Sequence, residues 1–148
     1  MAHKYPNVLI HCIFSTKARL NLIPDVLLPR LFPYLNGIGR NIRVPVIAAG
    51  GTANHVHMLI VLPSDMTVAK VMQIFKANSS RWIGEHGTKF AWQEGYGAFS
   101  VSASLRDTVR DYIEHQAEHH QKRSFEEEFA ALLGKCGIQF DSATLFAD

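Results

Sequence analysis

The sequence predicts an α+β domain, because short apolar runs that suit strands alternate with longer amphipathic runs that suit helices. The chain has 148 residues, and 47% of them are hydrophobic, which is enough for one domain with its own core. No linker-like stretch divides it, so we expect a single domain over residues 1–148. The expected element order is β-α-β-β-α-β followed by further helix. That order is typical of a ferredoxin-like split βαβ fold, an antiparallel sheet with helices on one face and a C-terminal helix.

Each element is assigned from its own local pattern. The expected strands span residues 7–15, 43–49, 55–62 and 98–103, and the expected helices span residues 25–41, 66–86, 105–122 and 124–134. Pro33 predicts a break or kink in the first helix. Gly50-Gly51 and then Ala53-Asn54 are expected to make the turn between the second and third strands, where Gly51-Thr52 suits a hairpin. Ser104 suits the N-cap of the third helix.

His55 and His57 flank one apolar residue in the third expected strand. Side chains alternate along a strand, so both imidazoles point to one face while Val56 and Met58 point to the other. Because the apolar pair is expected to face the helices, the imidazoles face the open side of the sheet, which another element must cover. The helix expected over residues 105–122, from this chain or from a partner chain, is the candidate. Two neutral imidazoles side by side can begin a metal site, although the same pattern also occurs as ordinary polar side chains.

Tyr112 and Gln116 form a second cluster further along the chain. They lie four residues apart in the expected helix 105–122, so they share one helix face. A phenol one turn from a carboxamide suits a nucleophile beside a metal ligand. The alternative is a half-buried tyrosine beside a solvated glutamine.

Together the two clusters resemble the single-tyrosine HUH transposases (His–hydrophobic–His), which include the REP-associated tyrosine transposases. The resemblance covers nearly the whole chain. The segments that carry it are His11–Lys17, Gly50–His57, Lys76–Ile83, Trp92–Ser102, Tyr112–Gln116, His119-His120 and Phe125–Phe129. It implies that Tyr112 is the nucleophile and that His55, His57 and Gln116 are metal ligands.

The resemblance also implies an activity and an assembly. The expected reaction is metal-dependent cleavage and rejoining of single-stranded DNA at hairpin-ended elements, through a 5′-phosphotyrosine intermediate. The expected ligand set suits Mg²⁺ or Mn²⁺ beside a substrate phosphate. The family implies a homodimer in which the Tyr112 helix can come from the partner chain. No base for Tyr112 is evident, and we interpret His115, His119 and His120 as polar groups on the helix surface.

Net charge alone does not indicate nucleic acid, since it is only +2. Basic residues dominate before residue 90 and acidic residues gather late in the chain. A modest basic surface on the first two-thirds could follow a phosphate backbone, but scattered solvated charges explain the pattern equally well. The candidate DNA-contacting residues are Lys17, Arg19, Lys76 and Arg81.

Cys12 and Cys136 are single thiols far apart in the sequence, and we expect both to serve packing. They fit a reducing cytoplasm. The N-terminus shows no signal-peptide pattern, and no apolar run approaches the roughly 20 residues of a membrane span. We therefore expect a cytoplasmic bacterial or archaeal protein with no membrane partner.

Three alternative functions stay open from the sequence. A domesticated HUH nuclease acting on repeated hairpins would keep the chemistry and change only the biological role. A non-catalytic ferredoxin-like nucleic-acid-binding module would stack bases on aromatic residues of the open sheet face, where this chain has imidazoles. A structural or redox metal protein is disfavoured because no pair of cysteine ligands is present.

Overall fold

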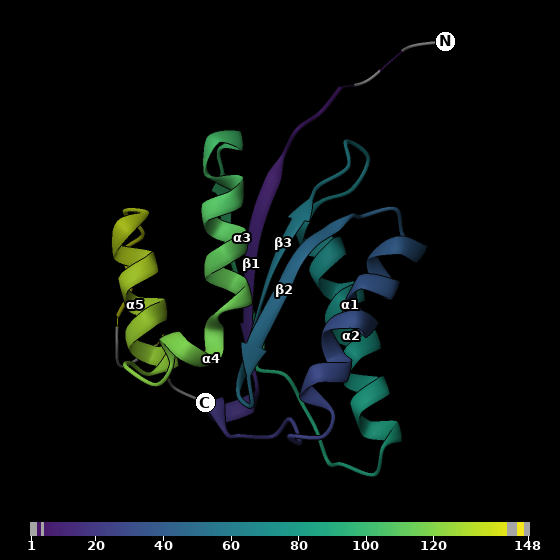
Figure 1. The fold of residues 1–148 in the computed structure, drawn as a ribbon, viewed down its shortest axis with the longest axis vertical. Helices are drawn as coiled ribbons and strands as arrows, with labels where there is room; N and C mark the ends of the chain where they lie inside the picture. Colours follow the sequence, from purple (N-terminus) through teal and green to yellow (C-terminus); the bar gives the residue numbers. More distant parts are fainter. Residues whose placement is uncertain (1–2, 4, 142–144, 147–148) are drawn as a thin grey trace.

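The computed structural model describes residues 3, 5–141 and 145–146. Its main elements are β1 (Leu9–Ser15), α1 (Leu28–Asn41), β2 (Val46–Thr52), β3 (His55–Val61), α2 (Val68–Glu85), β4 (Gly97–Val101), α3 (Arg106–Glu114), α4 (Gln116–His119) and α5 (Phe125–Lys135). The strands form one antiparallel sheet in the order β2-β3-β1-β4. This confirms the predicted α+β, ferredoxin-like split βαβ arrangement. Figure 1 shows α1 and α2 on one face of the sheet and α3 and α5 on the other.

The face beneath α1 and α2 holds the main apolar core. Val56 and Met58 of β3 are fully buried there, as the strand alternation predicted, and Phe14 of β1 packs beside them. Phe75 of α2 and Leu35 of α1 close the layer from the helix side. Each such side chain stabilises the fold by roughly 1.5–3 kcal/mol when it is fully buried.

The C-terminal helices cover the opposite face of the sheet. They are the elements that close the side expected to be open. Ile113 of α3 packs on Leu9 and Leu59, and Phe125 of α5 packs on Ile13. These small apolar clusters flank the histidines of β1 and β3. The helix that carries Tyr112 therefore lies over the His55–His57 face, as predicted from the sequence (Figure 1).

The expected helix 105–122 is wrong as a single element. It breaks at His115, whose φ of −113° and ψ of 30° are not helical. At this point α4 leaves the axis of α3 and the chain turns toward α5 (Figure 1). Ser104 is not the N-cap either, because it lies within a short 3₁₀ turn, Ala103–Leu105, and α3 begins after Leu105.

Two other local predictions also need correction. The break predicted at Pro33 is wrong, because α1 runs from Leu28 to Asn41 with Pro33 inside it, at the cost of one backbone hydrogen bond. Thr52 pairs directly with His55, so the expected turn is confirmed at Ala53-Asn54. It is wrong at Gly50, Gly51 and Thr52, which lie in β2. The pairing of β2 with β3 determines which residues form the turn, and the amino-acid composition of the turn does not reveal that pairing.

The cysteines differ from each other. Cys12 is buried in the main core, whereas Cys136 is exposed, so the packing role predicted for Cys136 is wrong. Across the described helices, none combines the length and the apolar content that a membrane span requires.

Candidate active site

Side chains from β3, α4, α5 and the turn after α4 converge above the sheet. Glu128 Oε1 lies 2.9 Å from His57 Nε2, 3.1 Å from His120 Nε2 and 3.8 Å from His55 Nε2. Gln116 Oε1 lies 3.1 Å from both His55 Nε2 and His120 Nε2. The structure therefore brings the predicted residues His55, His57 and Gln116 together, and adds His120 and Glu128 to them.

The hydrogen-bond network assigns the proton on His55. The Asn54 side-chain amide donates to the Arg19 carbonyl at 3.2 Å, so Asn54 Oδ1 faces His55 Nδ1, at 2.9 Å. A neutral His55 then donates from Nδ1 and presents a lone pair at Nε2. Gln116 is oriented in the same way, because its amide nitrogen donates to the Tyr112 carbonyl and its oxygen turns toward the imidazoles. Two acceptors therefore face each other.

Electrostatics keep these groups in the forms that bind cations. Burial, aided by the nearby His57, lowers the pKa of His55 to about 3, and burial also lowers the pKa of His57. Burial acts to raise the pKa of Glu128, but hydrogen bonds from His120 and His57 outweigh it and hold this pKa well below its usual range. Neutral imidazoles, an amide oxygen and a carboxylate thus converge, and this donor set fits a divalent metal ion. One ligand atom from each of His55, His57, His120 and Glu128 lies within 4.8 Å of the others.

His11 of β1 supports the site from below. Its Nε2 lies 2.8 Å from His57 Nδ1, and both side chains are buried. Burial, together with His57, lowers the pKa of His11 to about 3, so the neutral ring can donate to or accept from His57. A contact of this kind orients a metal-binding imidazole and selects its tautomer.

Tyr112 of α3 lies beside the histidines of its own chain. Its hydroxyl donates to Glu128 Oε2, and its ring contacts that of His119, with 4.6 Å between centroids. Burial, followed by the hydrogen bond and charge of Glu128, raises the pKa of Tyr112 to about 12. The phenol is therefore neutral at pH 7 in this arrangement, and its oxygen is held at the metal-ligand cluster.

Gly50 of β2 explains how α3 comes so close to the sheet. A Cβ at this position would lie 2.0 Å from the Ile113 carbonyl oxygen, closer than any side chain can approach. Ile113 follows Tyr112 directly, so the missing side chain at Gly50 sets the depth of the helix that carries Tyr112. The glycine is required by this close approach rather than by an unusual backbone conformation.

The site contains residues to which the sequence assigned no catalytic or binding role. His120 was interpreted as a helix-surface group, but it is largely buried against Gln116 and Glu128, whereas His115 is exposed. A signal for His120 was available, because it lies four residues after Gln116. Glu128 lies on the apolar face of α5 with Phe125 and Leu132, and an acidic residue in an apolar stripe needs a buried partner.

The candidate DNA-contacting residues lie outside this cluster. Lys17 is exposed, and Arg81 forms an exposed ion pair with Glu85 on α2. Lys76 donates to two backbone carbonyl oxygens ahead of β4, both at 2.7 Å. The Arg19 guanidinium donates to a backbone carbonyl near the C-terminus at 2.6 Å. These contacts support the fold, and DNA binding by the four residues stays a prediction.

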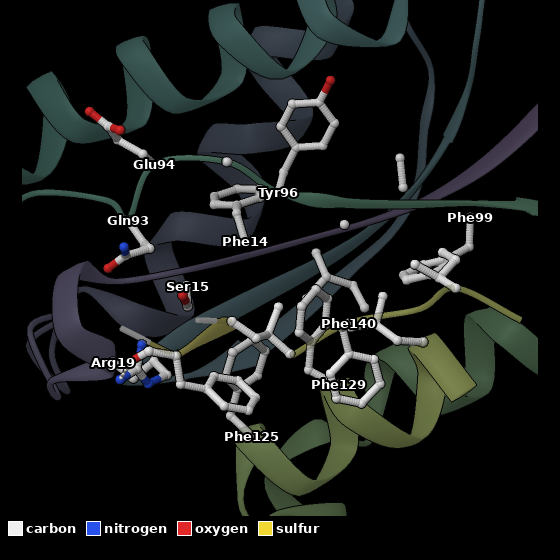
Figure 2. Close-up of a pocket in the computed structure, with 18 of the residues that line it drawn as sticks. Phe14, Ser15, Arg19, Gln93, Glu94, Tyr96, Phe99, Phe125, Phe129 and Phe140 are labelled. Carbon is white, nitrogen blue, oxygen red and sulfur yellow. Dashed lines mark hydrogen bonds between the residues drawn. The ribbon is translucent and has the colours of Figure 1, made fainter. Parts of the chain in front are cut away.

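A cavity of about 560 Å³ adjoins the site at the β4 edge of the sheet. Figure 2 shows Phe125 and Phe129 projecting into it from α5, with Phe140 nearby, Tyr96 across from them and Arg19 at one end. The Phe125 ring also packs on His55, with 4.7 Å between centroids. A single aromatic ring therefore separates this cavity from a candidate metal ligand.

The fold and the site define an α+β protein with a histidine-rich candidate metal centre and a tyrosine beside it. Residues 4–116 match the family described as Transposase IS200 like, so the chain belongs to this family of DNA-cleaving transposases.

Known proteins place the chain in the same group. It is 28% identical over 126 residues to the transposases for insertion sequence element IS200 of Salmonella typhimurium and Salmonella typhi, covering 80% of this chain and 82% of each relative. A crystal structure of a candidate transposase from Deinococcus radiodurans matches with a TM-score of 0.61 and 22% identity, over 78% of this chain and 96% of that one. The REP-associated tyrosine transposase bound to a REP hairpin matches with a TM-score of 0.56 and 14% identity, over 76% and 70%. These two structures support the fold.

Proposed function

We propose that this transposase cleaves and rejoins single-stranded DNA at hairpin-ended elements. In this proposal Tyr112 is the nucleophile, and His55, His57 and Gln116 hold a divalent metal ion, Mg²⁺ or Mn²⁺. The observation that carries the proposal is the meeting of the Tyr112 hydroxyl with the buried imidazoles of one chain, through Glu128.

The reaction is a transesterification that conserves the phosphodiester bond energy. The Tyr112 oxygen attacks the phosphorus and forms a 5′-phosphotyrosine bond, while the bond to the 3′ oxygen breaks. The phenol loses its proton, and the leaving oxygen gains one to become a 3′-hydroxyl. Attack by another 3′-hydroxyl reverses the step and joins new ends. When bound, the metal ion would polarise the scissile phosphate and stabilise the charge that grows in the transition state.

The aromatic cavity supports an unpaired strand as the substrate. Its volume of about 560 Å³ and its phenylalanine lining suit a base that has left the duplex stack. Stacking of a base on an aromatic side chain contributes about 1–3 kcal/mol. Since Phe125 separates this cavity from His55, a base bound there would lie next to the reacting phosphate. The REP hairpin bound by a structural relative supports hairpin DNA as the partner.

The homodimer that the family resemblance implies is also a proposal. Tyr112 lies beside His57 of its own chain, and this contact supports a site that is built without a helix from a partner. We therefore propose a homodimer in which each active site is built within one chain. Light scattering during size-exclusion chromatography measures the molecular mass in solution and so distinguishes a dimer from a monomer.

The proposed reaction is tested with single-stranded DNA from both flanks of the gene that encodes the protein. With Mn²⁺ present, we expect a covalent protein–DNA band in a denaturing gel, and EDTA should abolish it. The same sequence as a perfect duplex is the matched control and should give far less adduct. Absence of a covalent band with every flanking strand, in protein shown to be folded, would contradict the proposal.

A further inference from the structure

We propose that Glu128 binds the metal ion through one carboxylate oxygen and holds the Tyr112 hydroxyl through the other. One side chain would then connect the nucleophile to the metal centre. This inference rests on the proposed function and deepens it. It concerns a residue of α5, beyond residues 4–116 that match the family.

The first oxygen lies among the metal-binding nitrogens. Glu128 Oε1 is 2.9 Å from His57 Nε2 and 3.8 Å from His55 Nε2, and His120 Nε2 approaches it to 3.1 Å. Two ligands that share one ion at about 2.0–2.2 Å lie at most about 4.4 Å apart. The contacts made by Oε1 all fall within that range. An ion bound by His55 and His57 would therefore have this oxygen within reach.

The second oxygen faces the nucleophile, because Tyr112 donates its hydroxyl hydrogen to Glu128 Oε2. The two oxygens of one carboxylate are rigidly linked, so the position of Oε1 in the cluster also determines where Oε2 holds the phenol. Glu128 is thus a positioning residue for Tyr112 as well as a ligand. This arrangement explains how a side chain of α5 can act on a nucleophile of α3.

Charge gives a second reason for a cation at this place. The Glu128 side chain is only 1% exposed, and a carboxylate is costly to bury unless it is compensated. Within the described part of the chain, its ion-pair partners are histidines, and no lysine or arginine pairs with it. A divalent ion would supply the missing positive charge.

The neighbouring acidic residues of α5 have different surroundings, and one of them provides a matched control. Glu127 caps the helix through Ser124, in a capping box. Glu126 lies in the same first turn and is partly exposed. Phe125 packs inward and turns Glu128, one turn later, toward the histidines. Glu126→Gln therefore removes the same charge from the same helix turn without touching the cluster.

The direct test is Mn²⁺ binding to the full-length, EDTA-treated protein without DNA, measured by isothermal titration calorimetry. We expect Glu128→Gln to weaken Mn²⁺ affinity by about 10–100-fold, the range found when groups that support a metal site are removed. Glu126→Gln should stay within about twofold of the wild type, and His57→Ala should lose binding. At saturating Mn²⁺, Glu128→Gln should also slow adduct formation while leaving DNA affinity unchanged, because Tyr112 is no longer held.

The outcomes separate this proposal from the proposed function. If Glu128→Gln binds Mn²⁺ like the wild type while His57→Ala does not, the metal site stands and the role of Glu128 is overturned. If the wild type binds no Mn²⁺, both proposals are overturned. Should Glu128→Gln fail to fold, a crystal structure of the wild type with Mn²⁺ decides the question. An ion bound by a Glu128 oxygen supports the proposal, and an ion held only by His55, His57 and Gln116 overturns it.

Discussion

The two faces of β3 show how one strand serves both stability and chemistry. Val56 and Met58 point into a continuous apolar core under α1 and α2, whereas His55 and His57 point into a buried polar cluster under the C-terminal helices. Apolar burial needs no partner of defined geometry, but a buried polar atom needs one. Among the described residues, every buried side-chain nitrogen or oxygen lies within hydrogen-bonding distance of another polar atom. The polar face is therefore the more exacting one, and small changes there should affect chemistry before they affect folding.

The largest effect is expected at Tyr112, the proposed nucleophile. Tyr112→Phe should abolish covalent attachment to DNA, because the attacking oxygen is lost, while costing about 1.5–3 kcal/mol for its hydrogen bond to the Glu128 carboxylate. A denaturing gel measures the adduct. Tyr34→Phe is the control, since Tyr34 stacks on Trp82 on the other face. An adduct that persists in Tyr112→Phe would transfer the role to another tyrosine.

Adjacent residues of β3 separate the two faces most directly. His57→Ala should eliminate DNA cleavage, since it removes a proposed metal ligand, and Gln116→Ala should be milder because a neutral amide is a weaker ligand. Met58→Ala should instead lower the free energy of unfolding by about 2–5 kcal/mol and leave cleavage by the folded fraction intact. Urea denaturation and cleavage assays on the same samples measure both properties. Similar profiles for His57→Ala and Met58→Ala would refute the division between the faces.

Glycine substitutions probe how closely the polar face is packed. Gly50→Ala should displace α3, because the new Cβ meets the Ile113 carbonyl oxygen, and we expect a stability loss of about 1–3 kcal/mol with a larger loss of cleavage. Gly37→Ala, in α1, meets nothing within 4 Å, so it should be neutral or stabilise by up to about 1 kcal/mol. Thermal unfolding and adduct yield measure the pair. Wild-type activity in Gly50→Ala would show that the depth of α3 is not critical.

The free energy of unfolding of the metal-free protein should also depend on pH. Burial lowers the pKa of His11 and of His55 to about 3, while both values return to about 6.5 on unfolding. Below pH 6.5 the unfolded state binds more protons, so stability should decrease as pH falls toward 3, by up to about 1.4 kcal/mol per pH unit for each group. Urea denaturation at several pH values measures the slope. The free energy of unfolding of Met58→Ala should change with pH in parallel with that of the wild type. A wild-type free energy of unfolding that does not change with pH would contradict buried neutral histidines.

The smallest effect is expected from mixing inactive variants. A mixture of His57→Ala and Tyr112→Phe should remain inactive, because Tyr112 and His57 meet through Glu128 within one chain. Mixed dimers must be demonstrated by tagging each variant differently. Recovery of cleavage in such dimers would show that the catalytic helices are exchanged between protomers, as the family resemblance implied.

Local periodicity in the sequence determined the directions in which the key side chains of this protein point. The alternation of β3 predicted which side of the sheet Val56 and His57 would face, and the spacing of four predicted that Tyr112 and Gln116 would act together. The side chains face the directions that these patterns predicted, because strand and helix geometry depend on neighbouring residues only.

Only the tertiary structure decided what completes the cluster. His57 and Glu128 are 71 residues apart in sequence, and their contact depends on the helix break at His115 and on the packing of Phe125 against His55. The break was invisible to a periodicity argument because the sequence on either side of it favours helix. Glu128 stands beside Glu126 and Glu127 and is chemically identical to them, and only its place in the apolar stripe of Phe125 and Leu132 distinguishes it locally. It becomes a buried partner of three imidazoles and a phenol only because long-range packing directs that one face of α5 onto the sheet.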